Sequence, residues 1–151
     1  MKRVLKRRAA FSLIEVTLAL GVAGFCLLAV FGLLPIGVQT NQRALSQTAA
    51  TAILSSVVAD MRATPKTSPT TAQYAITFGA AKTLYFDSAG QFSTLIGTNS
   101  RYRLNITFPN GALAYPATYA DLTVTWPAAV DPLTTTPGGS SEIFAAFDRH
   151  P

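Results

Sequence analysis

The chain has 151 residues, of which 49% are hydrophobic and only 13% are charged, and its formal net charge is +5 at pH 7. This length allows one domain with an extension. Five of the twelve Lys and Arg fall within residues 1–10, which leaves seven basic and seven acidic residues from Phe11 onward. The neutral remainder disfavours a nucleic-acid-binding surface. Cys26 is the only cysteine, so an intrachain disulfide is excluded.

A long apolar run follows the basic residues. Between residues 11 and 38 the notably polar residues are Ser12, Glu15 and Thr17. A helix needs about 20 apolar residues to cross a bilayer. Because basic residues remain on the cytoplasmic side, we expect residues 1–10 inside the cell and the rest of the chain exported.

Three interpretations of this segment compete. The apolar run is too long for a secretory signal peptide, which has 7–15 apolar residues before a small-residue cleavage site. A plain signal anchor fits the length but leaves Glu15 unexplained, since a carboxylate at the centre of a membrane helix costs about 2.5–3.5 kcal/mol. The third interpretation is an anchor whose acidic residue has a cationic partner.

The stretch Ala10-Phe11-Ser12-Leu13-Ile14-Glu15-Val16 supports the third interpretation. It resembles the cleavage and methylation signal of type IV prepilins and of the pseudopilins of type II secretion. The resemblance implies that a prepilin peptidase cuts the leader, residues 1–10, between Ala10 and Phe11. It also implies that Phe11 becomes an N-methylated terminus and that Glu15, then the fifth residue, pairs with such an amine during filament assembly. The family usually has Gly before the cut, where this chain has Ala10.

The pairing also has a physical rationale. Proteolysis creates a cation one helical turn from the carboxylate, and a matched pair in a low-dielectric bundle roughly breaks even, whereas an unmatched charge is penalised. Glu15 would therefore set register between subunits.

The helical pattern continues through residues 39–64, although Pro35 predicts a kink within the apolar run. An apolar stripe marks one face of this continuation. The stripe comprises Leu45, Ala49, Ile53, Leu54, Val57, Val58 and Met61. We expect Ser46 to lie off the stripe and Asp60 and Arg62 to be solvated. Pro65 ends the helix, and residues 65–73 form a turn-rich linker.

Residues 74–151 alternate between apolar and polar, as half-buried antiparallel strands do. The expected strands are residues 74–78, 83–86, 101–108, 121–126 and 142–148. Residues 87–90 and 109–111 resemble turns. Residues 127–141 form a long loop, either a partner contact or a tolerated insertion. We expect Arg101 and Arg103 on a solvated strand face.

These elements predict an α+β fold in which one long helix packs on a small antiparallel sheet, as the pilin-like resemblance also implies. No catalytic motif is present. The single histidine, His150, is next to the last residue, and the scattered carboxylates lack the density of a calcium loop. We therefore expect no enzymatic activity, metal or cofactor.

The predicted protein is a minor pilin-like or pseudopilin-like subunit in the inner membrane of a bacterium, with its outer domain periplasmic or extracellular. Its expected partners are the prepilin peptidase and other pilin subunits. A weaker resemblance is to the prepilin-like cassette proteins of the Verrucomicrobia-type group. Two alternatives are a membrane-anchored accessory protein that never assembles and a DNA-uptake pilin; the latter needs a basic stripe with exposed aromatic residues.

Overall fold

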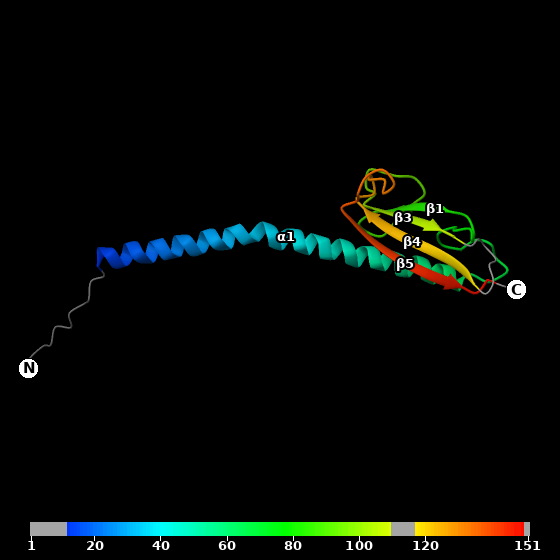
Figure 1. Cartoon of the computed structure of the whole chain (residues 1–151), viewed down its shortest axis with the longest axis horizontal. Helices are drawn as coiled ribbons and strands as arrows, with labels where there is room; N and C mark the ends of the chain where they lie inside the picture. Colours follow the sequence, from blue (N-terminus) through cyan, green and yellow to red (C-terminus); the bar gives the residue numbers. More distant parts are fainter. Residues whose placement is uncertain (1–11, 110–116, 150–151) are drawn as a thin grey trace, which may run out of the picture. The chain divides into compact units, whose positions relative to one another are not determined.

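The computed structural model describes residues 12–109 and 117–149, and these residues form one helix and five strands (Figure 1). Helix α1 spans Leu13–Ala63. The strands are β1 (Lys82–Phe86), β2 (Phe92–Ser93), β3 (Tyr102–Thr107), β4 (Thr118–Trp126) and β5 (Gly139–Phe147). The chain divides into two compact units, Met1–Asn41 and Gln42–Pro151. The fold is therefore α+β, as the sequence predicts.

The five strands form one antiparallel sheet in the order β2-β1-β3-β4-β5. Every long strand pairs with the next long strand along the chain, as sequential strands commonly do. Strands β3 and β4 follow the predicted alternation. Tyr102, Leu104 and Ile106 of β3 are buried, and so are Leu122 and Val124 of β4.

The core of the second unit lies between this sheet and the last part of α1. Six helix residues belong to one hydrophobic cluster with side chains from the sheet: Ala50, Ile53, Leu54, Val57, Val58 and Met61. The predicted stripe is thus confirmed from Ile53 to Met61, and Ala49 packs against the cluster, which also includes Ala50, a residue outside the predicted stripe. The prediction is wrong for Leu45, the first residue of the stripe, because Leu45 is 62% exposed and the neighbouring Ser46 is buried instead. Arg101 explains the exchange, since its guanidinium donates to the Ser46 hydroxyl at 3.3 Å.

Residues 74–78 were predicted as a strand, and this prediction is wrong. The segment contributes only an isolated bridge between Thr70 and Thr77. Its alternation is real, because Tyr74, Ile76 and Phe78 are all buried in the core. The backbone follows a turn instead, in which the Ile76 amide donates to the Thr71 hydroxyl and Ala75 has a φ of 49°. Alternating burial therefore arises here without a ladder of strand hydrogen bonds.

The turns and loops between the strands agree with the sequence prediction in part. The predicted turn after β1 is confirmed: the Asp87 carboxylate accepts from the amides of Ala89 and Gln91, and Gly90 has a φ of 80° that favours glycine. The long loop between β4 and β5 is shorter than predicted, because β5 begins at Gly139. The predicted turn at residues 109–111 lies mostly outside the described residues.

Two charged side chains that the sequence left without a structural role tie the second unit together. Asp60 is half-buried and accepts from the amides of Gln73 and Tyr74 at 3.2 and 3.1 Å, so it is not merely solvated, whereas Arg62 is exposed as predicted. Arg149 is buried and donates to the carbonyls of Thr64, Pro65, Lys66 and Ser68, just after α1 ends. Cationic groups near a helix C-terminus satisfy its free carbonyls.

Candidate functional site at the start of helix α1

The first turn of α1 is closed by reciprocal hydrogen bonds between Ser12 and Glu15. The Glu15 amide donates to the Ser12 hydroxyl at 3.2 Å, and the Ser12 amide donates to Glu15 Oε2 at 3.3 Å. This arrangement is a capping box, which satisfies two amides that a helix N-terminus leaves without partners. The sequence Ser12-Leu13-Ile14-Glu15 carries the S-x-x-E pattern of this motif.

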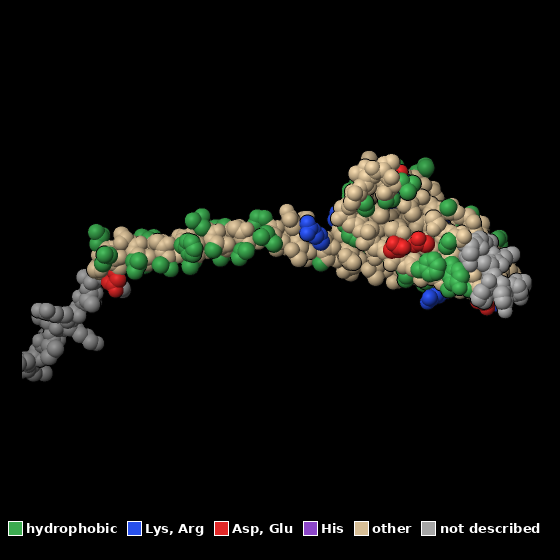
Figure 2. Space-filling model, in the orientation of Figure 1, with side chains coloured by type: hydrophobic (Ala, Val, Ile, Leu, Met, Phe, Trp, Pro, Cys, Tyr) green, Lys and Arg blue, Asp and Glu red, His purple; other side chains and the backbone are tan. Residues whose placement is uncertain are grey.

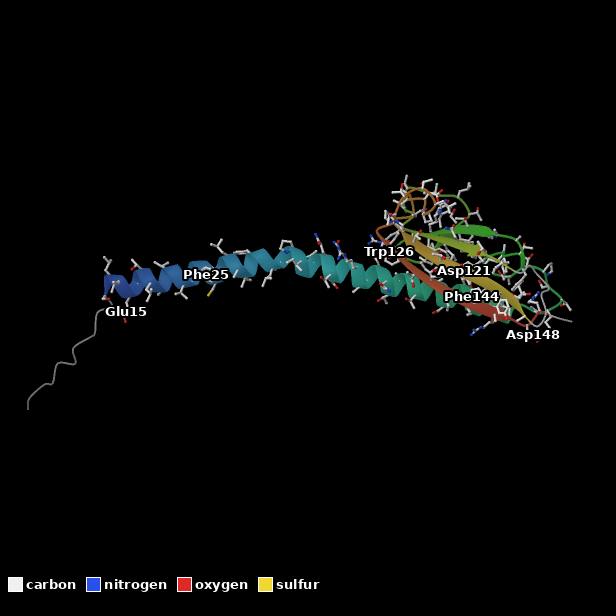
Figure 3. All side chains as sticks on the ribbon, in the orientation of Figure 1. Glu15, Phe25, Asp121, Trp126, Phe144 and Asp148 are labelled. Carbon is white, nitrogen blue, oxygen red and sulfur yellow. The ribbon has the colours of Figure 1, made fainter. Side chains whose placement is uncertain are left out.

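Glu15 is the only charged residue among the described residues 12–41. Figure 3 shows it at the first turn of α1, with Phe25 further along the same helix. The Leu, Ile, Val and Phe side chains from Leu13 to Val38 are between 45% and 84% exposed. An exposed apolar surface of this extent marks contact with lipid or with another protein.

The length and composition of α1 are sufficient for a membrane crossing. One polar side chain within the apolar segment, Thr17, has a local hydrogen-bond partner. The Thr17 hydroxyl donates to the Ile14 carbonyl at 3.0 Å. A group with such a partner costs less in hydrocarbon than a free one.

Ala19 and Ala23 follow Glu15 at intervals of four residues, so the three lie on one face of the helix. Together with Val16 and Leu20 they line a shallow hollow on its surface. Small residues let a second helix approach closely in a membrane. The face that carries the carboxylate therefore also carries two small side chains, Ala19 and Ala23.

The remaining predicted site residues stand as follows. The predicted cleavage and methylation positions, Ala10 and Phe11, lie outside the described residues, and so does His150. Pro35 lies inside α1, whose assignment continues across it. Proline has no amide hydrogen to donate to the Phe31 carbonyl, and the kink at this position stays a prediction.

The two arginines predicted on a solvated strand face differ: Arg101 lies just before β3 and is exposed, as predicted, whereas the prediction is wrong for Arg103 in β3. Arg103 Nη1 lies 3.4 Å from Asp131 Oδ1, and its side chain is only 18% exposed. The same nitrogen donates to the Val130 carbonyl. Arg103 thus fastens the loop between β4 and β5 to the sheet, while Arg101 contacts Ser46.

Among the residues that the structure describes, no group of three or more His, Cys, Asp or Glu side chains could hold a metal ion. Comparison with known proteins finds no match to a family model, to a curated protein or to a solved structure.

Proposed function

We propose that this chain is a minor pilin or pseudopilin subunit, made as a precursor and built into a filament after its leader is removed. The observation that carries the proposal is Glu15, the lone charge in the first turn of an apolar, exposed helix. The residues from Phe11 to Val16 resemble the prepilin signal in type and order, Ala10 stands where that signal usually has Gly, and a basic leader precedes them.

Glu15 is suited to pair with a terminal amine. The carboxylate is exposed, and the Ser12 amide contacts only its Oε2 atom at 3.3 Å. Cleavage between Ala10 and Phe11 would place a positive amine one residue before Ser12. An unmatched carboxylate is costly in hydrocarbon. The pair would therefore fix which neighbouring subunit docks and the axial register between the two helices.

The rest of the chain is consistent with an architectural role. The apolar side chains of residues 13–38 would bundle with the helices of other subunits. The second unit would face the periplasm or the cell exterior, with residues 1–10 in the cytoplasm before processing. Prepilin peptidase and other pilin subunits are the partners in this proposal, and it involves no catalytic residue, metal or cofactor.

The first experiment determines the N-terminus of the protein after co-expression with a prepilin peptidase. Mass spectrometry should find a chain that starts at a methylated Phe11. A chain that retains Met1 in the presence of an active peptidase would contradict the proposal and leave a plain membrane anchor.

The second experiment separates the charge of Glu15 from its capping role. Glutamine also closes a capping box, so Glu15→Gln keeps the helix start and removes only the charge. We expect this variant to be inserted and cleaved but to be depleted from sheared filaments, measured against other pilin subunits. Ser12→Ala is the matched control, because it breaks the capping box and keeps the carboxylate. Normal incorporation of Glu15→Gln would rule out the pairing.

A further inference from the structure

The free edge of β5 has no partner strand among the described residues. Strand β5 pairs along its whole length with β4, from Thr118↔Phe147 to Trp126↔Gly139, and it is the last strand of the sheet. We propose that this edge binds an extended, arginine-bearing segment of another polypeptide, which adds to the sheet as a further strand.

Exposed sheet edges are usually protected against such pairing by proline, charged side chains (lysine above all), bulges or extreme shortness, and the one charged residue of β5 is Glu142. Strand β2, at the opposite end of the sheet, has only two residues. Strand β5 has nine residues, and its sequence GSSEIFAAF contains neither proline nor a basic residue. Its register with β4 is also uninterrupted. The edge thus retains the features that favour strand addition.

The edge carries exposed apolar side chains on both faces of the sheet. Ile143 lies opposite Leu122 on the core face and is still 39% exposed. Phe144 lies on the outer face and is 60% exposed. The Phe144 ring stacks on Tyr119, with ring centroids 5.4 Å apart and an interplanar angle of 18°. An added strand would cover Ile143 on one face and Phe144 on the other.

Two carboxylates flank the exposed aromatic ring. Asp121 lies directly opposite Phe144, and Glu142 precedes it by two positions on the same face. Figure 2 shows acidic side chains beside a hydrophobic patch on this part of the surface, and Figure 3 labels Asp121 and Phe144 there. Asp121 Oδ1 is buried and has no hydrogen-bond partner among the described residues. This oxygen needs a donor.

The exposed Phe144 ring, the two carboxylates beside it and Ile143 indicate which side chains the added strand should carry. An arginine can stack on the Phe144 ring and donate to neighbouring carboxylates with the same planar group. A side chain next to it along the strand points to the other face, where Ile143 favours an aliphatic residue. The expected segment therefore alternates arginine and aliphatic residues. A second copy of β5 fits poorly, because it would bring Glu142 against an edge without basic residues.

The experiment adds a synthetic peptide, acetyl-TRVRVRT-amide, to the full chain in detergent micelles. Hydrogen exchange should show new protection within residues 139–147 and none at β2. Peptides with glutamate in place of arginine, or with proline in place of the second valine, should not protect the edge. Glu142→Gln and Phe144→Ser should each weaken binding by about two- to fivefold, as expected for cross-strand pairs.

The controls use equivalent side chains elsewhere in the second unit. Leu133→Ser removes an apolar side chain that is 92% exposed, and Asp148→Asn removes an exposed carboxylate. Neither change should alter peptide affinity. The proposal is overturned if the peptide binds without protecting β5, if the acidic peptide protects it equally, or if the peptide does not bind at millimolar concentration. Protection of β5 that rises with protein concentration alone would instead assign the edge to a second copy.

Discussion

The guanidinium carbon of Arg149 lies 4.0 Å from the centroid of the Phe78 ring. The same guanidinium donates to four carbonyls in residues 64–68. A single buried cation thus joins the end of α1, the segment before β1 and the end of β5. Many hydrogen bonds to one charged group make this junction sensitive to small changes in side-chain shape.

Replacing Arg149 by lysine should therefore destabilise the second unit although the charge is kept. Lysine has three donors on one atom and cannot present a flat group to both Phe78 and the carbonyls. We expect the free energy of unfolding to fall by about 2–4 kcal/mol. The measurement is urea unfolding in detergent, followed by the fluorescence of Trp126, the only tryptophan.

The neighbouring ion pair provides the control for this prediction. Lys66 Nζ lies 2.7 Å from Asp148 Oδ2, but the two side chains are 50% and 68% exposed. Exposed pairs contribute about 0–1 kcal/mol, so Asp148→Asn should change stability far less than Arg149→Lys. Equal losses for the two variants would show that Arg149 acts only as a surface charge.

Gly139 is the position where the start of β5 passes beneath the ring of Trp126. A Cβ atom at Gly139 would lie 2.3 Å from Trp126 Cζ2. Gly139→Ala should displace the ring and lower the free energy of unfolding by about 1–3 kcal/mol, as overpacking does. A shift in the emission maximum of Trp126 would report the displacement.

Gly138 offers a matched comparison one residue earlier. A Cβ atom there would lie 3.4 Å from the Trp126 carbonyl oxygen and 3.7 Å from Pro127 Cδ. Gly138→Ala should consequently leave the emission of Trp126 and the stability nearly unchanged. If both alanine variants behaved alike, close approach to the indole ring would not be the reason for glycine at residue 139.

Asp60 should prove structural rather than solvated. Its two carboxylate oxygens accept from Gln73 and Tyr74, and the Tyr74 hydroxyl lies 2.7 Å from the Ser56 hydroxyl. Asp60→Ala should cost about 1–3 kcal/mol, because two amides lose their acceptor. Hydrogen exchange at Gln73 and Tyr74 should accelerate. Arg62→Ala, on the exposed face of the same helical turn, should leave both amides protected.

The sequence alone determined the features that depend on local period and composition. Three such features are patterns of neighbouring residues and are predicted correctly. They are the apolar run long enough to cross a bilayer, the helix that continues from it, and the alternation of β3 and β4. The capping box of Ser12 and Glu15 was equally local. The charge of Glu15 predicts a cationic partner, whereas its spacing of three residues from Ser12 predicts the capping box.

Only the tertiary structure decided the features that depend on residues far apart in the chain. The burial of Ser46 requires Arg101, and the role of Asp60 requires the segment at Gln73. Residues 74–78 alternate like a strand, yet among the described residues they pair with no strand of the sheet and form one isolated bridge, between Thr77 and Thr70. A periodic pattern reports which side chains face the core, whereas hydrogen-bond partners are set by how distant segments pack.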